Sequence, residues 1–112
     1  MKTILVVDDE ADILDIYAYF LEQAGYGVIL ADSQKSALNI IKNFKFYGVI
    51  ADLKMPNTNS AVWVKELEKF SGTSKVVLVT GVTEAPELKG SKLSVLVKPI
   101  DFQLVLKTLE DQ

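Results

Sequence analysis

The sequence lacks both cysteine and histidine, and these two absences exclude whole classes of chemistry. Without cysteine there is no disulfide bond and no thiol nucleophile, which suits a reducing compartment. Without histidine there is no serine–histidine or cysteine–histidine triad, and the commonest zinc ligands are missing. Any chemistry must therefore depend on carboxylates, hydroxyls, lysines and a hard cation.

Long apolar runs and long basic runs are also absent. No stretch approaches the roughly 20 apolar residues of a membrane span. The N-terminus leads after Met1–Thr3 directly into a strand-like run that ends in acids, which does not resemble a signal peptide. The net charge of −3 at pH 7 disfavours direct binding to nucleic acid or to anionic membranes. With 112 residues, 49% of them hydrophobic, the chain can bury a core, and we expect one cytoplasmic domain.

Short apolar runs alternate with amphipathic segments along the whole chain. The apolar runs predict buried strands over residues 4–7, 28–30, 49–51, 76–79 and 93–97. Apolar residues at helical spacing predict helices over residues 11–24, 33–43, 60–72 and 101–110, with Ser33, Ser60 and Asp101 at or near their N-caps. Between the last two strands only residues 84–89 can be helical, so the fourth of five helices is expected to be short or irregular.

Five repeats of strand and helix mean parallel strands joined by right-handed crossovers. The chain length fits a flavodoxin-like α/β fold, a doubly wound (βα)5 arrangement whose five-stranded parallel sheet has the strand order 2-1-3-4-5. We expect residues 1–112 to form this single domain. In such sheets ligands bind beyond the carboxyl ends of the strands.

Polar side chains stand at the ends of four of the predicted strands. Asp8 and Asp9 end the first, Asp52 the third, Thr80 the fourth and Lys98 the fifth. Any one of these residues alone is more typical of a turn or a helix cap, but chance rarely supplies all four strand ends together. Crowded carboxylates need a hard cation such as Mg²⁺ or Mn²⁺, and a lysine and a hydroxyl suit phosphoryl oxygens. The pattern therefore predicts phosphoryl transfer at this edge of the sheet.

The segments that carry these residues resemble the receiver domains of two-component response regulators, and the resemblance covers essentially the whole chain. It rests on the acidic first strand, a phosphoacceptor motif, a strand ending in a hydroxyl and a small residue, and a Lys-Pro signature: Ile4–Glu10, Asp52–Pro56, Val77–Gly81 and Leu96–Pro99.

The resemblance implies a role for each residue of the acid cluster. Asp52 would take a phosphoryl group from the phosphohistidine of a sensor histidine kinase or a phosphotransfer protein. Mg²⁺, for which Mn²⁺ can substitute, would be held by Asp9, by Asp52, by the backbone carbonyl of Lys54 and, through water, by Asp8. The domain would be a phosphoacceptor rather than an enzyme, apart from slow self-catalysed dephosphorylation.

Two further residues complete the implied switch. Lys98 would pair first with Asp52 and then with the phosphoryl group, and Thr80 would move toward a phosphoryl oxygen. The Lys98–Pro99 peptide bond is usually cis in this family, at a modest energetic cost. Output would pass to an unknown partner protein or to an effector domain outside this sequence, and a homodimer linked to phosphorylation is possible.

Three positions depart from the family's usual pattern. Val95 replaces an aromatic residue, so coupling between Thr80 and an aromatic rotamer is not available in its usual form. Ser60 replaces a glycine, so the turn after Pro56 must form without glycine's conformational freedom or must shift. The side chain of Lys54 is either solvated or pairs with the carboxylates, in which case it alters cation affinity or phosphoryl lifetime.

Two aromatic and apolar features have more than one interpretation. The first helix carries apolar residues beyond its core face, which indicate either a broad buried face or a contact surface for a phosphohistidine helix bundle: Ile13, Ile16, Tyr19 and Phe20. Trp63, on the predicted third helix, has the same two interpretations, and we expect it to be a partly buried packing residue.

Other functions remain open at this point. A pseudo-receiver would keep the acids as part of a protein-interaction module that does not use phosphorylation. A phosphatase of the haloacid dehalogenase kind needs a second acid two residues after the nucleophile, where this chain has Lys54. A flavodoxin needs a phosphate-binding loop where this chain has acids, which would repel phosphate.

Overall fold

The computed structural model describes residues 1–81 and 93–112. These ranges form four helices and a five-stranded sheet. In chain order the elements are β1 (Thr3–Val7), α1 (Ala11–Gln23), β2 (Gly27–Ala31), α2 (Gln34–Asn43), β3 (Gly48–Asp52), α3 (Ser60–Phe70), β4 (Lys75–Thr80), β5 (Ser94–Val97) and α4 (Phe102–Glu110). The helix expected over residues 84–89 lies outside the described residues.

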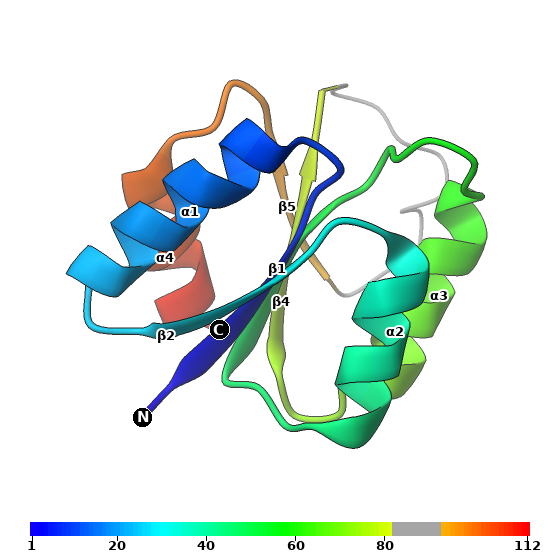
Figure 1. Ribbon diagram of the computed structural model, residues 1–112, viewed down its shortest axis with the longest axis horizontal. Coiled ribbons are helices and arrows are strands. Elements are labelled where there is room, and N and C mark those ends of the chain that lie inside the picture. Colours follow the sequence, from blue (N-terminus) through cyan, green and yellow to red (C-terminus); the bar gives the residue numbers. More distant parts are fainter. Residues whose placement is uncertain (82–92) are drawn as a thin grey trace.

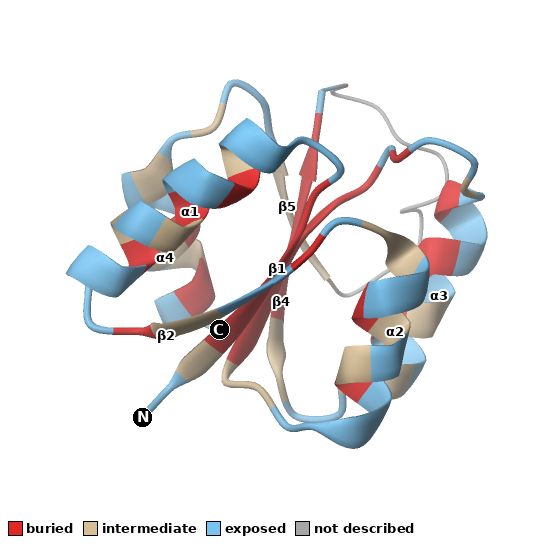
Figure 2. Cartoon of the chain, viewed as in Figure 1, coloured by how far each residue is buried: buried red, intermediate tan, exposed pale blue. Residues whose placement is uncertain are grey.

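All strand pairs are parallel, and the strand order is β2-β1-β3-β4-β5, as the sequence predicts. Helices α1 and α4 cover one face of the sheet, and α2 and α3 cover the other (Figure 1). The central strands β1, β3 and β4 bury their residues in two cores, which is why they are continuously apolar, whereas Ile29 and Leu30 of the edge strand β2 are exposed. In β1, Ile4 and Val6 pack with α1 and α4, whereas Leu5 and Val7 pack with α2 and α3. Figure 2 shows the buried strands between helices whose outer faces are exposed.

The predicted helix caps are confirmed at two of three positions. The side-chain oxygens of Ser33 and Asp101 accept hydrogen bonds from the N–H groups of Ser36 and Leu104, both at 3.1 Å. The prediction of Ser60 as a cap is wrong. Asn59, with an extended backbone, is the N-cap of α3, and its Oδ1 accepts from the N–H of Val62. Asparagine and serine cap helices about equally well, so composition alone could not decide between neighbours.

The turn between β3 and α3 forms without a glycine at position 60. Asn57 takes the left-handed backbone conformation, with φ of 59°. Asparagine tolerates this region better than most residues because its short side chain bonds locally. The positive φ thus lies at the residue after Pro56, and Ser60 is the first residue of α3.

Other details of the elements follow from packing. Strand β5 begins at Ser94, one residue later than predicted, and the partly buried Val95 packs against the core beneath α2 and α3. Trp63 was expected to be partly buried but is completely inaccessible. Within the part of the chain that the structure describes, no helix is long and apolar enough to cross a membrane.

Candidate phosphoacceptor site

The predicted acid cluster forms at the carboxyl ends of β1 and β3. One carboxylate oxygen from each of Asp8, Asp9 and Asp52 lies within 4.8 Å of the others. The side chains come together because Val7 and Ala51 are register partners in adjacent parallel strands. Asp8 and Asp52 are buried, whereas Asp9 is exposed. The cluster therefore has two fixed acids at its base and one acid at its rim.

Lys98, directly after β5, adds a positive charge to the cluster. Its Nζ lies 3.2 Å from Oδ2 of Asp52. Thr80 is buried at the end of β4, and its backbone carbonyl accepts a hydrogen bond of 2.7 Å from the N–H of Lys98. The peptide bond between Lys98 and Pro99 is cis, which confirms the expectation drawn from the resemblance. The structure thus brings together Lys98, Thr80 and the three acids that the sequence selected.

The electrostatics of the cluster favour a bound cation. Burial raises the pKa of Asp8, against the hydrogen bond from the N–H of Glu10, and the charge of Asp52 raises it further. Burial also raises the pKa of Asp52, although the ammonium of Lys98 acts in the opposite direction. Burial alone would lower the pKa of Lys98, but its hydrogen bond to Asp52 and the neighbouring acids raise it overall. One ammonium group therefore does not neutralise the acids.

The donor set fits a hard divalent ion. It consists of carboxylate oxygens with no soft ligand, and Asp9 is open to solvent. Mg²⁺ binds such oxygen sites through one or two carboxylates and keeps several waters. Lys54 lies in the loop directly after Asp52, with its side chain exposed and its backbone N–H hydrogen-bonded to the Asp52 carboxylate. That bond holds the loop close to the acids.

Sequence reasoning missed one residue of the site. The indole Nε1–H of Trp63 donates a hydrogen bond of 3.1 Å to the backbone carbonyl of Asp52. For Trp63 the sequence favoured a partly buried packing role over a surface contact, and neither interpretation includes a hydrogen bond to the site. A buried indole N–H needs a partner, and that requirement is the one signal that could have pointed to this contact.

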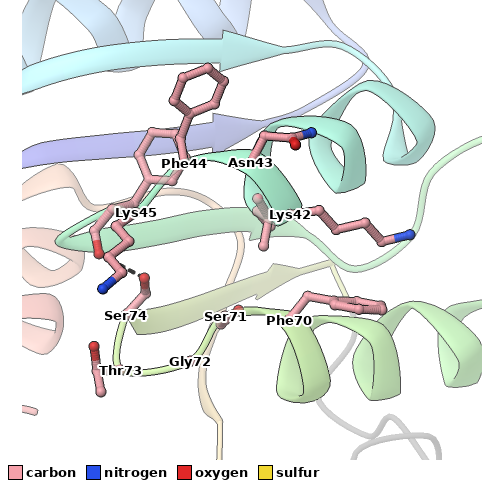
Figure 3. Close-up of a pocket in the computed structure, with 11 residues that line it drawn as sticks. Lys42, Asn43, Phe44, Lys45, Phe70, Ser71, Gly72, Thr73 and Ser74 are labelled. Carbon is pink, nitrogen blue, oxygen red and sulfur yellow. Dashed lines mark hydrogen bonds between the residues drawn. The ribbon is translucent and has the colours of Figure 1, made fainter.

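A second hollow lies away from this cluster, where β3 and β4 begin. This pocket of about 340 Å³ lies between the carboxyl ends of α2 and α3. Figure 3 shows Phe44, Lys45 and Ser74 around it, with the hydroxyl of Ser74 donating to the carbonyl of Phe46 at 2.7 Å. None of the predicted site residues lines it. The chemistry of the strand ends is therefore confined to the opposite edge of the sheet.

Comparison with known proteins gives one consistent result. The family model of the response regulator receiver domain matches residues 4–110. The transcriptional regulatory protein ZraR of Escherichia coli is 32% identical over 96% of this chain. The chain spans only 25% of the length of that relative. The chemotaxis protein CheY4 of Vibrio cholerae has a TM-score of 0.83 at 29% identity, with 99% of this chain and 98% of that chain covered.

A further solved structure carries a ligand. The response regulator protein TrrA of Thermotoga maritima, described in complex with Mg²⁺ and BeF, is 25% identical, with a TM-score of 0.85 over 99% of this chain and 98% of that chain. The family match reaches from β1 to the end of α4, so it takes in the acid cluster together with the strands that position it. The chain therefore belongs to the response regulator receiver domain family.

Proposed function

We propose that this receiver domain is a signalling phosphoacceptor whose nucleophile is Asp52. The observation that supports it most strongly is the ammonium of Lys98 at 3.2 Å from a buried carboxylate that has two further acids beside it. A carboxylate oxygen of Asp52 would form the new P–O bond while the P–N bond of a phosphohistidine breaks. The bonding electron pair of that P–N bond stays on the imidazole nitrogen. The donor leaves as neutral imidazole when the other ring nitrogen of the phosphohistidine carries a proton.

Mg²⁺ would be held by the carboxylates of Asp9 and Asp52, by the backbone carbonyl of Lys54 and, through a water molecule, by Asp8; Mn²⁺ would substitute. When bound, the ion supplies positive charge that offsets the repulsion between the acids and the phosphoryl oxygens. The residues of the chain contribute by holding the acids in position. Two of the acids are buried, and the Asp8 carboxylate is fixed by a hydrogen bond of 2.9 Å from the N–H of Glu10.

Lys98 and Thr80 would hold the transferred group. The ammonium can follow the charge from the Asp52 carboxylate to a phosphoryl oxygen, and the Thr80 hydroxyl can donate to another. Slow hydrolysis of the aspartyl phosphate by the domain itself would reset the signal. Because Val95 is aliphatic, the switch would act through Thr80 without a change of aromatic rotamer.

A groove beside the acids is where we propose that the phosphohistidine donor docks. It encloses about 420 Å³ between the first half of α1 and the segment after β5, and is lined by Glu10, Ile13, Ile16, Lys98, Pro99, Ile100 and Phe102. Ile16 and Tyr19 are 47% and 70% exposed on the outer side of α1. A histidine kinase or a phosphotransfer protein would cover these side chains while its phosphohistidine reaches Asp52. Output would then pass to an effector domain or a partner protein.

Beryllofluoride, which mimics a phosphoryl group on a carboxylate, tests this function without a donor protein. We expect Mg²⁺ and beryllofluoride together to raise the thermal unfolding midpoint more than either alone, and to shift the NMR resonances of Asp52 and Thr80. The Asp52→Asn variant should not respond to beryllofluoride. If the wild-type protein binds Mg²⁺ but ignores beryllofluoride, the pseudo-receiver interpretation replaces this one.

A further inference from the structure

The loop after β3 is held by side chains that hydrogen-bond its backbone carbonyls. The indole of Trp63 donates to the carbonyl of Asp52 at 3.1 Å. The hydroxyl of Ser60 donates to the carbonyl of Leu53 at 3.2 Å. The hydroxyl of Thr58 donates to the carbonyl of Met55 at 2.6 Å. Carbonyls on both sides of Lys54 therefore have fixed partners.

Two of the three donors belong to one face of α3. Ser60 and Trp63 stand three residues apart, so both side chains project from the same side of the helix. Both are buried, and Trp63 is completely inaccessible. Trp63 packs in the core between α3 and the sheet, which fixes its ring. Helix α3 thus presents two rigid donors to two successive carbonyls, those of the phosphoacceptor and of the next residue.

We propose that Ser60 and Trp63 are positioning residues that set the cation affinity of the site through the backbone of residues 52–54. This inference rests on the proposed function, because it concerns the same acids and the carbonyl of Lys54. Neither side chain belongs to the acid cluster, and both donate to backbone carbonyls. Each fixes a peptide unit, and the position of that unit determines where the Asp52 carboxylate and the Lys54 carbonyl point.

The physical reason is the strict geometry of Mg²⁺. The ion requires nearly octahedral ligands at short distances, so a small displacement of one protein oxygen weakens its binding. Loss of a second-shell partner typically lowers metal affinity by roughly 10-fold to 100-fold. Removal of either donor also leaves a buried carbonyl without its hydrogen bond, which the loop would relieve by moving. We expect the lower end of this range for each variant, since the other donor remains.

Matched variants test the proposal. Trp63→Phe keeps an aromatic ring but loses the N–H, and Ser60→Ala loses the hydroxyl. Ser60→Thr keeps the hydroxyl and should restore the wild-type behaviour. Val62→Ala, on the exposed side of α3, is the control. Mg²⁺ affinity by titration calorimetry and the unfolding midpoint are measured for each variant. The single indole N–H resonance of this one-tryptophan protein is followed in every protein that keeps Trp63.

We expect Trp63→Phe and Ser60→Ala to bind Mg²⁺ roughly 10-fold more weakly while Ser60→Thr and the Val62 control stay within 2-fold of wild type. In wild-type protein, Mg²⁺ should shift the indole N–H resonance. If Ser60→Ala and Trp63→Phe bind Mg²⁺ as tightly as the wild type, the proposal is wrong while the proposed function stands. If the wild type itself binds no Mg²⁺, the proposed function fails and this inference fails with it.

Discussion

Within the Lys98–Asp52 pair, substitution of Lys98 should lower the stability of the fold and substitution of Asp52 should raise it. Lys98→Met removes the ammonium but keeps an apolar stem of similar length. Because the pKa of Lys98 is raised in the folded domain, the fold favours the charged lysine, and its loss should destabilise. Burial raises the pKa of Asp52, so the fold disfavours its charge, and Asp52→Asn should stabilise the cation-free domain.

The size of the lysine effect follows from distance and exposure. Two unit charges 3.2 Å apart attract by about 5 kcal/mol at an effective dielectric constant of about 20. The cost of desolvating the two charges offsets most of this attraction. Because the Lys98 side chain is 37% exposed, solvent also screens the attraction that remains. We expect a loss of about 1–2 kcal/mol, between the values for surface pairs and for broken buried pairs. In a domain of this size that lowers the unfolding midpoint by roughly 5–10 °C.

Thermal unfolding followed by circular dichroism at pH 7, with a chelator present, measures these effects. The double variant of Lys98→Met and Asp52→Asn closes a mutant cycle, in which the cost of losing the lysine should largely disappear. Lys65→Met, an exposed lysine on α3, is the control and should change stability by less than about 0.5 kcal/mol. An unchanged midpoint for Lys98→Met, or a lowered one for Asp52→Asn, would refute the reasoning.

Three further predictions concern the site and its support. Burial raises the pKa of Asp8, so the protonated carboxyl stabilises the fold below its unfolded pKa of about 4. That contribution is lost as the pH rises through the folded pKa of Asp8. Asp8→Asn should therefore raise the unfolding midpoint of the cation-free domain at pH 7 but not at pH 3. A Cβ on Gly48 would lie 2.6 Å from Cδ1 of Leu109, so Gly48→Ala should lower the free energy of unfolding by about 1–3 kcal/mol in urea, and an unchanged value would contradict this packing. If the Lys54 side chain affects the acids, Lys54→Ala should change Mg²⁺ affinity or the dephosphorylation rate; unchanged values would end that idea.

The sheet and the acid cluster could be predicted because both follow from rules that act locally. Strands buried on two faces must be continuously apolar, and parallel strands bring their carboxyl ends to one edge. Asp8, Asp52 and Thr80 lie at that edge wherever the exact strand boundaries fall. The boundary error at Ser94 therefore left the expected site unchanged.

The support behind the cluster could not be predicted, because it depends on which of two equivalent neighbours takes a role. Asn59 and Ser60 can both cap a helix, and only the folded loop gives the cap to Asn59 and the Leu53 carbonyl to Ser60. The indole of Trp63 likewise needed a buried acceptor, but several carbonyls could have served. Tertiary geometry, which periodicity does not encode, made that choice.

The central claim is tested most directly by the intact mass of the protein after incubation with acetyl phosphate and Mg²⁺. We predict a gain of one phosphoryl group on the wild-type chain, no gain with a chelator present, and no gain on Asp52→Asn. An unmodified wild-type protein, or equal modification of Asp52→Asn, would contradict the assignment of Asp52 as the phosphoacceptor.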